Sequence, residues 1–73
     1  MPNQEVAVHV NSKTVKSNVY DLDVYDTYTL QRAVMSLASQ INFWMAEGRP
    51  EMAEPYGLFK ERIKRHIGGN HYA

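Results

Sequence analysis

Apolar and polar residues alternate along the N-terminal part of the chain. In the segment EVAVHV, residues 5–10, valine occupies every second position. A period of two predicts a β-strand that buries one face. A turn-like stretch at residues 11–13 follows, and a second extended run spans about residues 14–25, with one face formed by Tyr20, Leu22 and Val24. We expect the two strands to pair as a β-hairpin.

The apolar period changes to that of an amphipathic helix after residue 26. Asp26, Thr27 and Thr29 are residue types that cap helix N-termini, and Gly48 followed by Pro50 predicts where the helix ends. Apolar residues at 3.6-residue spacing predict its buried stripe, which comprises Leu30, Ala33, Val34, Leu37, Ala38, Ile41, Trp44 and Met45. We expect Trp44 to be largely buried between this helix, the hairpin and the last helix.

The remaining sequence predicts a helical turn from Pro50 through Glu54 and then a last helix. This last helix is expected to begin at Pro55, because proline is favoured in a first helical turn. Gly68 and Gly69 predict its end. Its expected buried stripe comprises Tyr56, Phe59, Ile63 and Ile67.

These elements predict an α+β fold, in which a β-hairpin is followed by a central helix and a shorter C-terminal helix. Residues 1–73 are expected to form a single domain with flexible ends at residues 1–4 and 69–73. The length is near the lower limit for a self-sufficient core, and the chain contains no cysteine. The longest apolar run is far too short to span a membrane, and no signal peptide is visible, so we expect a cytoplasmic protein that does not bind membranes.

Charge is balanced overall but uneven along the chain. Lys plus Arg and Asp plus Glu number eight each. Residues 20–28, YDLDVYDTY, carry three aspartates and no base, whereas residues 60–66, KERIKRH, carry four Lys or Arg and one glutamate. The basic segment fits either a solvated helix end, where cations favour the helix dipole, or a docking patch for phosphate or an acidic protein. The neutral net charge and the missing readout motif weigh against direct, specific DNA binding.

No combination of residues matches a catalytic or metal-binding motif. The three histidines, His9, His66 and His71, lack the spacing of metal ligands. Asp21 and Asp23 share one strand face, but we expect that face to be exposed, where solubility is a simpler role than acid–base chemistry. We therefore expect no catalytic residues, no cofactor and no metal.

The function class that remains is binding to another molecule. Met35 and Phe43 lie off the apolar stripe of the central helix, and tyrosines, which are enriched at interfaces, cluster in the acidic segment. The expected partner-binding residues are Tyr20, Tyr25, Met35, Phe43, Leu58, Arg62 and Arg65. An open edge of the hairpin is a further candidate, because it can accept a peptide strand.

The whole chain, from MPNQEVAVHV through QRAVMSLASQINFWMAEGRPEMAEPYG to KERIKRHIGGNHYA, resembles the RNA-polymerase-binding transcription regulators of lytic Xanthomonas phages. The resemblance implies a protein in the host bacterial cytoplasm that binds the N-terminal region of the polymerase β′ subunit and the neighbouring β flap. It implies inhibition of sigma-dependent initiation and antitermination. It transfers no individual residue, so the partner-binding residues above rest on their expected exposure.

Two alternatives stay open. The first is a small nucleic-acid-binding protein that uses the basic C-terminal helix through Lys60, Arg62, Lys64 and Arg65. The second is a homodimeric interaction module that buries Met35 and Phe43 against a second copy. For binding to polymerase, we expect the last helix to act as an electrostatic docking surface. Reversing both Arg62 and Arg65 to glutamate should then slow association with polymerase and leave the fold intact, because neither side chain is expected in the core.

Overall fold

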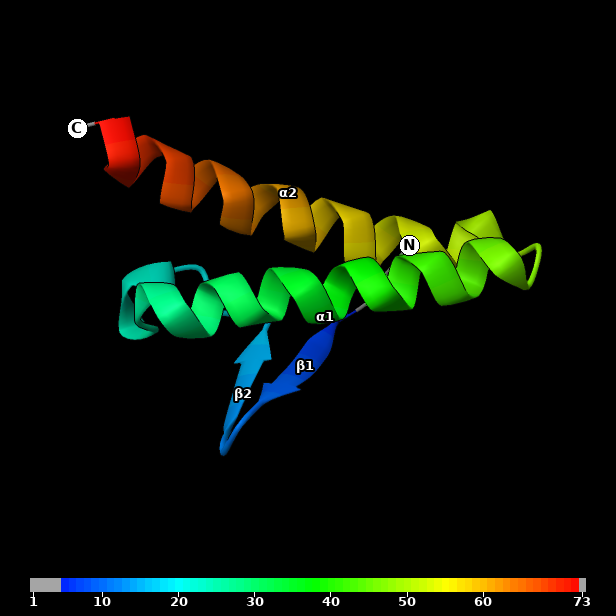
Figure 1. The fold of residues 1–73 in the computed structure, drawn as a ribbon, viewed down its shortest axis with the longest axis horizontal. Helices are drawn as coiled ribbons and strands as arrows, with labels where there is room; N and C mark the ends of the chain where they lie inside the picture. Colours follow the sequence, from blue (N-terminus) through cyan, green and yellow to red (C-terminus); the bar gives the residue numbers. More distant parts are fainter. Residues whose placement is uncertain (1–4, 73) are drawn as a thin grey trace.

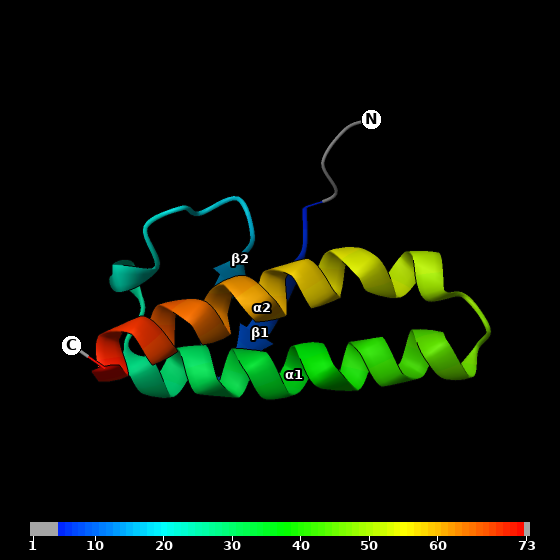
Figure 2. The ribbon, with the colours of Figure 1, turned by 90° about the horizontal axis from the view of Figure 1, so that it is seen from above.

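The computed structural model of the protein describes the backbone of residues 5–72 and the side chains of residues 5–68. The elements, in order, are β1 (Ala7–Val10), β2 (Lys13–Lys16), the short 3-10 helix η1 (Leu22–Val24), α1 (Thr27–Ala46) and α2 (Pro50–Tyr72). The two long helices run side by side in opposite directions, and the hairpin lies against one side of α1 (Figures 1 and 2). A β-hairpin followed by two helices confirms the predicted α+β class.

The hairpin buries one face, as the alternation predicts. β1 and β2 are antiparallel, with Val8 opposite Val15 and Val10 opposite Lys13. Asn11 begins the turn with a φ of 57°, a left-handed conformation that asparagine adopts more readily than most residues. The valines at positions 6, 8, 10 and 15 are all buried, so the valine face of the hairpin forms one layer of the core.

The predicted extension of the second strand to residue 25 is wrong. β2 ends at Lys16 because Ser17 closes the ladder with both its backbone and its side chain: its N–H donates to the Val6 carbonyl at 2.8 Å, and its hydroxyl accepts from the Val6 N–H at 2.9 Å. The Asp21 carboxylate then accepts from the Asp23 N–H at 3.1 Å and caps η1. Such local bonds compete with strand pairing. As a result Leu22 enters the core, whereas Tyr20 and Val24, predicted to share its face, are exposed.

The boundaries of α1 match the sequence signals. The Asp26 carboxylate accepts from the Thr29 N–H at 2.9 Å and caps the helix, and the chain turns away at Gly48 with a φ of 75°. Leu30, Ala33 and Leu37 are buried in the core.

The prediction for Trp44 is only partly right. The C-terminal part of α1 extends beyond the hairpin (Figure 1), so the indole is half-buried and lies outside the main core. It packs edge-on against the Phe43 ring at 5.0 Å, with the Arg49 guanidinium 5.9 Å from its ring centre. Met45, also placed on the buried stripe by the sequence, is exposed.

α2 is one continuous helix of 23 residues, so the predicted break at Pro55 and the shorter C-terminal helix are both wrong. Pro55 lies in the second turn, where it removes only the hydrogen bond to the carbonyl of Glu51. The helix also continues through Gly68 and Gly69 to Tyr72, so the glycines do not end it. Of the ends expected to be flexible, residues 1–4 and 73 lie outside the described residues.

The core forms where the hairpin, α1 and α2 meet. Its four most completely buried large side chains are Val15, Leu30, Leu37 and Ile63. Phe59 is also buried, and Tyr56 and Ile67 pack partly buried against the same cluster, which confirms the stripe predicted for the last helix. Each of the three layers therefore contributes to one shared core.

Candidate protein-binding surface

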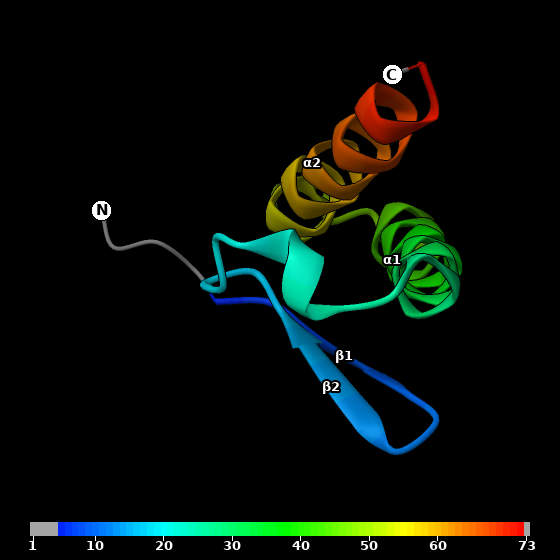
Figure 3. The same cartoon turned by 90° about the vertical axis from the view of Figure 1, so that its left-hand side faces the viewer.

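An open groove of about 480 Å³ lies between α2 and the loop that follows β2. Figures 2 and 3 show this loop running alongside α2. The groove, called here the loop–helix groove, is lined by Glu5, Ser17, Asn18, Tyr20, Pro55, Leu58, Phe59 and Arg62. Tyr20, which is 85% exposed, comes from the loop, and Leu58, which is 67% exposed, comes from α2. The groove therefore presents two large apolar side chains to solvent.

Arg62 fixes one side of this groove. Its guanidinium donates to the carbonyl of Ser17 at 3.0 Å and to the carbonyl of Val19. The guanidinium carbon also lies 5.7 Å from the centre of the Tyr20 ring and 5.3 Å from that of Phe59, within the range of cation–π attraction. Arg62 therefore ties the loop, and Tyr20 with it, to α2.

Arg62 is bonded within the molecule and is not the free surface charge that the sequence suggested, so we expect reversal of its charge to destabilise the fold. The side chain is half-buried, and a glutamate in its place would direct a carboxylate at the two carbonyl oxygens of the loop. Arg65 does fit the expectation, because it is exposed. It continues the line of Leu58 and Arg62 along α2, since residues three and four apart share one side of a helix.

The basic segment of α2 lies close to the acidic segment of the chain. His66 Nε2 is 3.2 Å from an Asp23 carboxylate oxygen, an ion pair when the imidazole is protonated. With Arg62 also bonded within the molecule, Lys64 and Arg65 are the exposed bases of the segment, and Lys60 is half-buried. The two charged segments that the sequence separates therefore lie next to one another in the fold.

Tyr25 was expected at the partner-binding surface, and the structure places it against the hairpin instead. Its hydroxyl donates to the Thr14 carbonyl at 3.3 Å and accepts from the Lys16 N–H at 3.4 Å. Its ring packs partly buried against the core. Tyr25 therefore has a structural role on the outer edge of β2.

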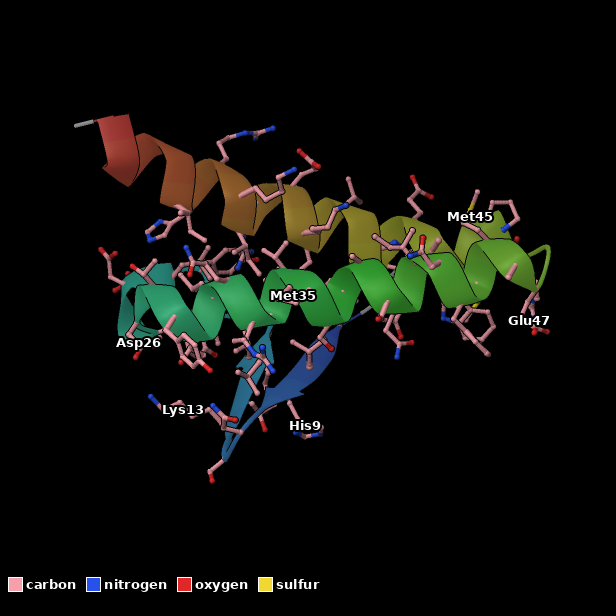
Figure 4. The ribbon with its side chains drawn as sticks, in the orientation of Figure 1. His9, Lys13, Asp26, Met35, Met45 and Glu47 are labelled. Carbon is pink, nitrogen blue, oxygen red and sulfur yellow. The ribbon has the colours of Figure 1, made fainter. Side chains whose placement is uncertain are left out.

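Met35 and Phe43 are both exposed, so α2 covers neither. Met35 lies on α1 beside β1 (Figure 4), and Phe43 lies near the C-terminal end of α1. The structure thus brings together Tyr20, Leu58 and Arg62 from the expected set, and leaves Met35 and Phe43 at separate places.

Several residues of the loop–helix groove carry no signal in the sequence. Glu5, Asn18 and Pro55 line it, yet the sequence pattern gave each of them only a local role: Glu5 and Asn18 within the predicted strands, and Pro55 at the predicted start of the last helix. The groove exists because Arg62 reaches a loop 45 residues earlier in the chain. A contact at that separation leaves no periodic pattern.

In the part of the chain that the structure describes, little supports a metal site or a membrane-spanning helix. Among residues 5–68, whose side chains the structure describes, no group of three or more His, Cys, Asp or Glu side chains is placed to hold a metal ion. No helix within residues 5–72 is long and apolar enough to cross a membrane. The pKa of the Asp26 carboxyl is held below its ordinary value by its hydrogen bonds with Thr29, with a smaller contribution from Lys13, and this reflects its role as a helix cap.

Comparison with known proteins finds no matching protein-family model, no matching curated protein and no matching solved structure. Function must therefore be argued from the surfaces described above and from the resemblance of the sequence. Of these surfaces, the loop–helix groove is the one that brings exposed large side chains from two elements together.

Proposed function

We propose that this protein binds the RNA polymerase of a bacterial host and regulates its transcription. The partner comes from the resemblance to phage transcription regulators, which points to the β′ N-terminal region and the β flap. Binding there would block promoter recognition by the sigma factor and allow elongating polymerase to pass terminators. The protein would act in the host cytoplasm as a binding protein without catalytic activity.

One observation supports binding through the loop–helix groove in particular. Tyr20 and Leu58 stand exposed on opposite sides of it, and Arg62 bonds the backbone of the loop that carries Tyr20, with its guanidinium 5.7 Å from the centre of the Tyr20 ring. Exposed large apolar residues around a groove mark interaction sites on small proteins, and a preorganised tyrosine loses little conformational entropy on binding. The exposed bases Lys64 and Arg65 would then act mainly on the rate of association with an acidic partner.

The test measures binding of the protein to immobilised core RNA polymerase of the host. We expect Tyr20→Ala and Leu58→Ser each to weaken binding by tenfold or more, as residues at the centre of an interface do. Met45→Ser is the matched control, because Met45 is an exposed apolar residue at the far end of α1 (Figure 4). Circular dichroism verifies that each variant folds.

Two outcomes would overturn parts of this proposal. Failure of the parent protein to bind polymerase would remove the partner. Binding by both groove variants at the parent's strength would remove the groove, whoever the partner is. The two alternatives are tested in parallel: steep salt dependence of binding to duplex DNA would indicate phosphate contacts, and sedimentation as a dimer would indicate self-association through Met35 and Phe43.

A further inference from the structure

The two edges of the hairpin differ in whether their outward-pointing backbone groups are hydrogen-bonded. Ser17 donates to Val6, so Val6 and Ser17 form a hydrogen-bonded pair, and such pairs alternate with non-bonded ones along an antiparallel ladder. The register then leaves His9 opposite Thr14, and Ala7 opposite Lys16, as non-bonded pairs. The N–H and C=O groups of these four residues therefore point outwards, two residues on each edge.

On β2 three of the four outward groups are already occupied, because the Lys16 carbonyl accepts from the Val19 N–H and the Tyr25 hydroxyl takes two more. The Tyr25 hydroxyl bonds the Thr14 carbonyl and the Lys16 N–H, which are the outward groups nearest to one another. On β1, no group in the described part of the chain bonds the outward backbone of Ala7 or His9. The hairpin thus has one covered edge and one open edge.

A trough follows the open edge between β1 and α1. One part, of about 330 Å³, is lined by Ala7, Val8, His9, Ser36, Gln40 and Tyr56. The adjoining part, of about 280 Å³, shares His9 and Ser36 with it and adds Val10, Asn11, Arg32, Met35 and Ser39. Figure 4 shows Met35 on α1 above His9 on β1. The trough shares no lining residue with the loop–helix groove.

We propose that the open edge of β1 is a second binding site, which takes an extended acidic segment of a partner protein as an added strand. Unbonded N–H and C=O groups along a strand edge are the complement of another extended backbone, and the trough gives alternate side chains room beside α1. The lining contains Arg32 and no carboxylate, so an acidic side chain on the incoming strand is favoured.

A second copy of this chain fits the same edge less well. Its own β1 is preceded by a single carboxylate, that of Glu5, which lines the loop–helix groove of its own chain and not the trough. Pairing of two β1 strands would also bring the His9 residues of the two copies onto adjacent strands. The charge of the trough therefore favours a foreign acidic segment. This inference does not depend on which protein occupies the loop–helix groove.

The experiment titrates the ¹⁵N-labelled full chain with an end-blocked peptide of alternating valine and glutamate. We expect saturable shifts of the Ala7 and His9 amide signals and slower hydrogen exchange at both. A lysine-for-glutamate peptide should bind more weakly. A peptide methylated at alternate backbone nitrogens keeps every side chain and should lose roughly tenfold in affinity, because it lacks two backbone donors.

Protein variants distinguish the contribution of the β1 backbone edge to binding from that of the Arg32 charge. Ala7→Pro removes an outward N–H that takes no part in the β1–β2 ladder. Proline is tolerated at such a position of an edge strand, so the variant should fold but should no longer bind the peptide. Arg32→Glu should weaken binding of the acidic peptide roughly fivefold, while Lys64→Glu, an equal change of charge on exposed α2, should not.

Three results would overturn the proposal. The first is equal binding of the parent and N-methylated peptides. The second is a set of shifts confined to the loop–helix groove. The third is protection of the Ala7 and His9 amides that rises with protein concentration alone, which would assign the edge to a second copy. None of these results depends on polymerase binding, so the two proposals fail independently.

Discussion

Individual charged side chains hold the segment between β2 and α1 in place. Arg62 donates to two loop carbonyls, His66 lies against Asp23, and Asp26 caps α1. Hydrogen bonds that involve an ionised group are stronger than neutral ones. Residues 17–26, which contain little regular secondary structure, are therefore positioned largely by side chains.

Removal of the Arg62 side chain is expected to destabilise the fold. Arg62→Ala loses two charge-assisted hydrogen bonds and the packing on Phe59, and we expect a cost of about 2 kcal/mol in the free energy of unfolding. Arg65→Ala, an exposed change on the same side of α2, should cost less than about 0.5 kcal/mol. Urea denaturation measures both, and equal costs for the two variants would contradict the structural role of Arg62.

Asp26 gives the stability a dependence on acidic pH. Its pKa in the folded protein lies below the ordinary value of 3.8, so the unfolded chain binds a proton more readily than the folded one. The stabilising contribution is therefore complete above the ordinary pKa and is lost as the pH falls through the lower, folded-state pKa. We expect Asp26→Asn, whose amide oxygen can still accept from Thr29, to lose less stability than the parent between pH 6 and about pH 3. A parallel loss in both proteins would count against this assignment.

At the scale of the elements, the accuracy of sequence prediction followed the strength of the local signal. The valine alternation and the apolar stripe of α1 were clear, and β1, α1 and the turn at Gly48 lie where expected. The run from Val19 to Tyr25 also alternates, but its aspartates make local caps, and the strand does not form. Pro55 and Gly68 are weak helix breakers in this setting, because α2 packs along α1 and its buried stripe runs from before Pro55 to Ile67.

Substitutions at Gly48 and Gly68 compare a glycine that ends a helix with a glycine that lies within one. A methyl group at either position would meet no atom within 4 Å, but Gly48 has a φ of 75° and Gly68 is helical. We expect Gly68→Ala to stabilise the protein by about 0.4–1 kcal/mol, and Gly48→Ala to destabilise it by about 1 kcal/mol. Thermal denaturation of both variants gives the signs, and a loss of stability in Gly68→Ala would mean that α2 does not continue as described.

At the scale of the whole molecule, the fold brings together segments that the sequence could not place side by side. Leu58 is exposed as the helix period predicts, whereas Tyr20 was predicted on the same face as Leu22 and is exposed instead; the position of both on one groove was not foreseeable. Arg62 was recognised as a candidate for the wrong reason, since its partners are backbone carbonyls far away in the sequence. The helix period shows which face is exposed, but not which loop will cover part of it.

The position of the core also changes the expected effect of mutations on stability. Leu37 is fully buried where all three layers meet, and Leu37→Ala should cost about 2–5 kcal/mol. Trp44 is larger, but it is half-buried outside the main core, so Trp44→Ala should cost less than Leu37→Ala. Guanidinium denaturation ranks the two variants, and the reverse order would show that the end of the helical pair contributes more to stability than its centre.

The hydroxyl of Tyr25 has a consequence for self-assembly. Edge strands with free backbone groups are starting points for fibrils, because each added chain exposes a new edge for the next. If two copies paired through β1, the resulting four-stranded sheet would carry a β2 strand on both outer sides, and each would already be covered by a Tyr25 hydroxyl. We expect growth to stop at two chains in that case, because one phenol per molecule occupies backbone groups that a further strand would need.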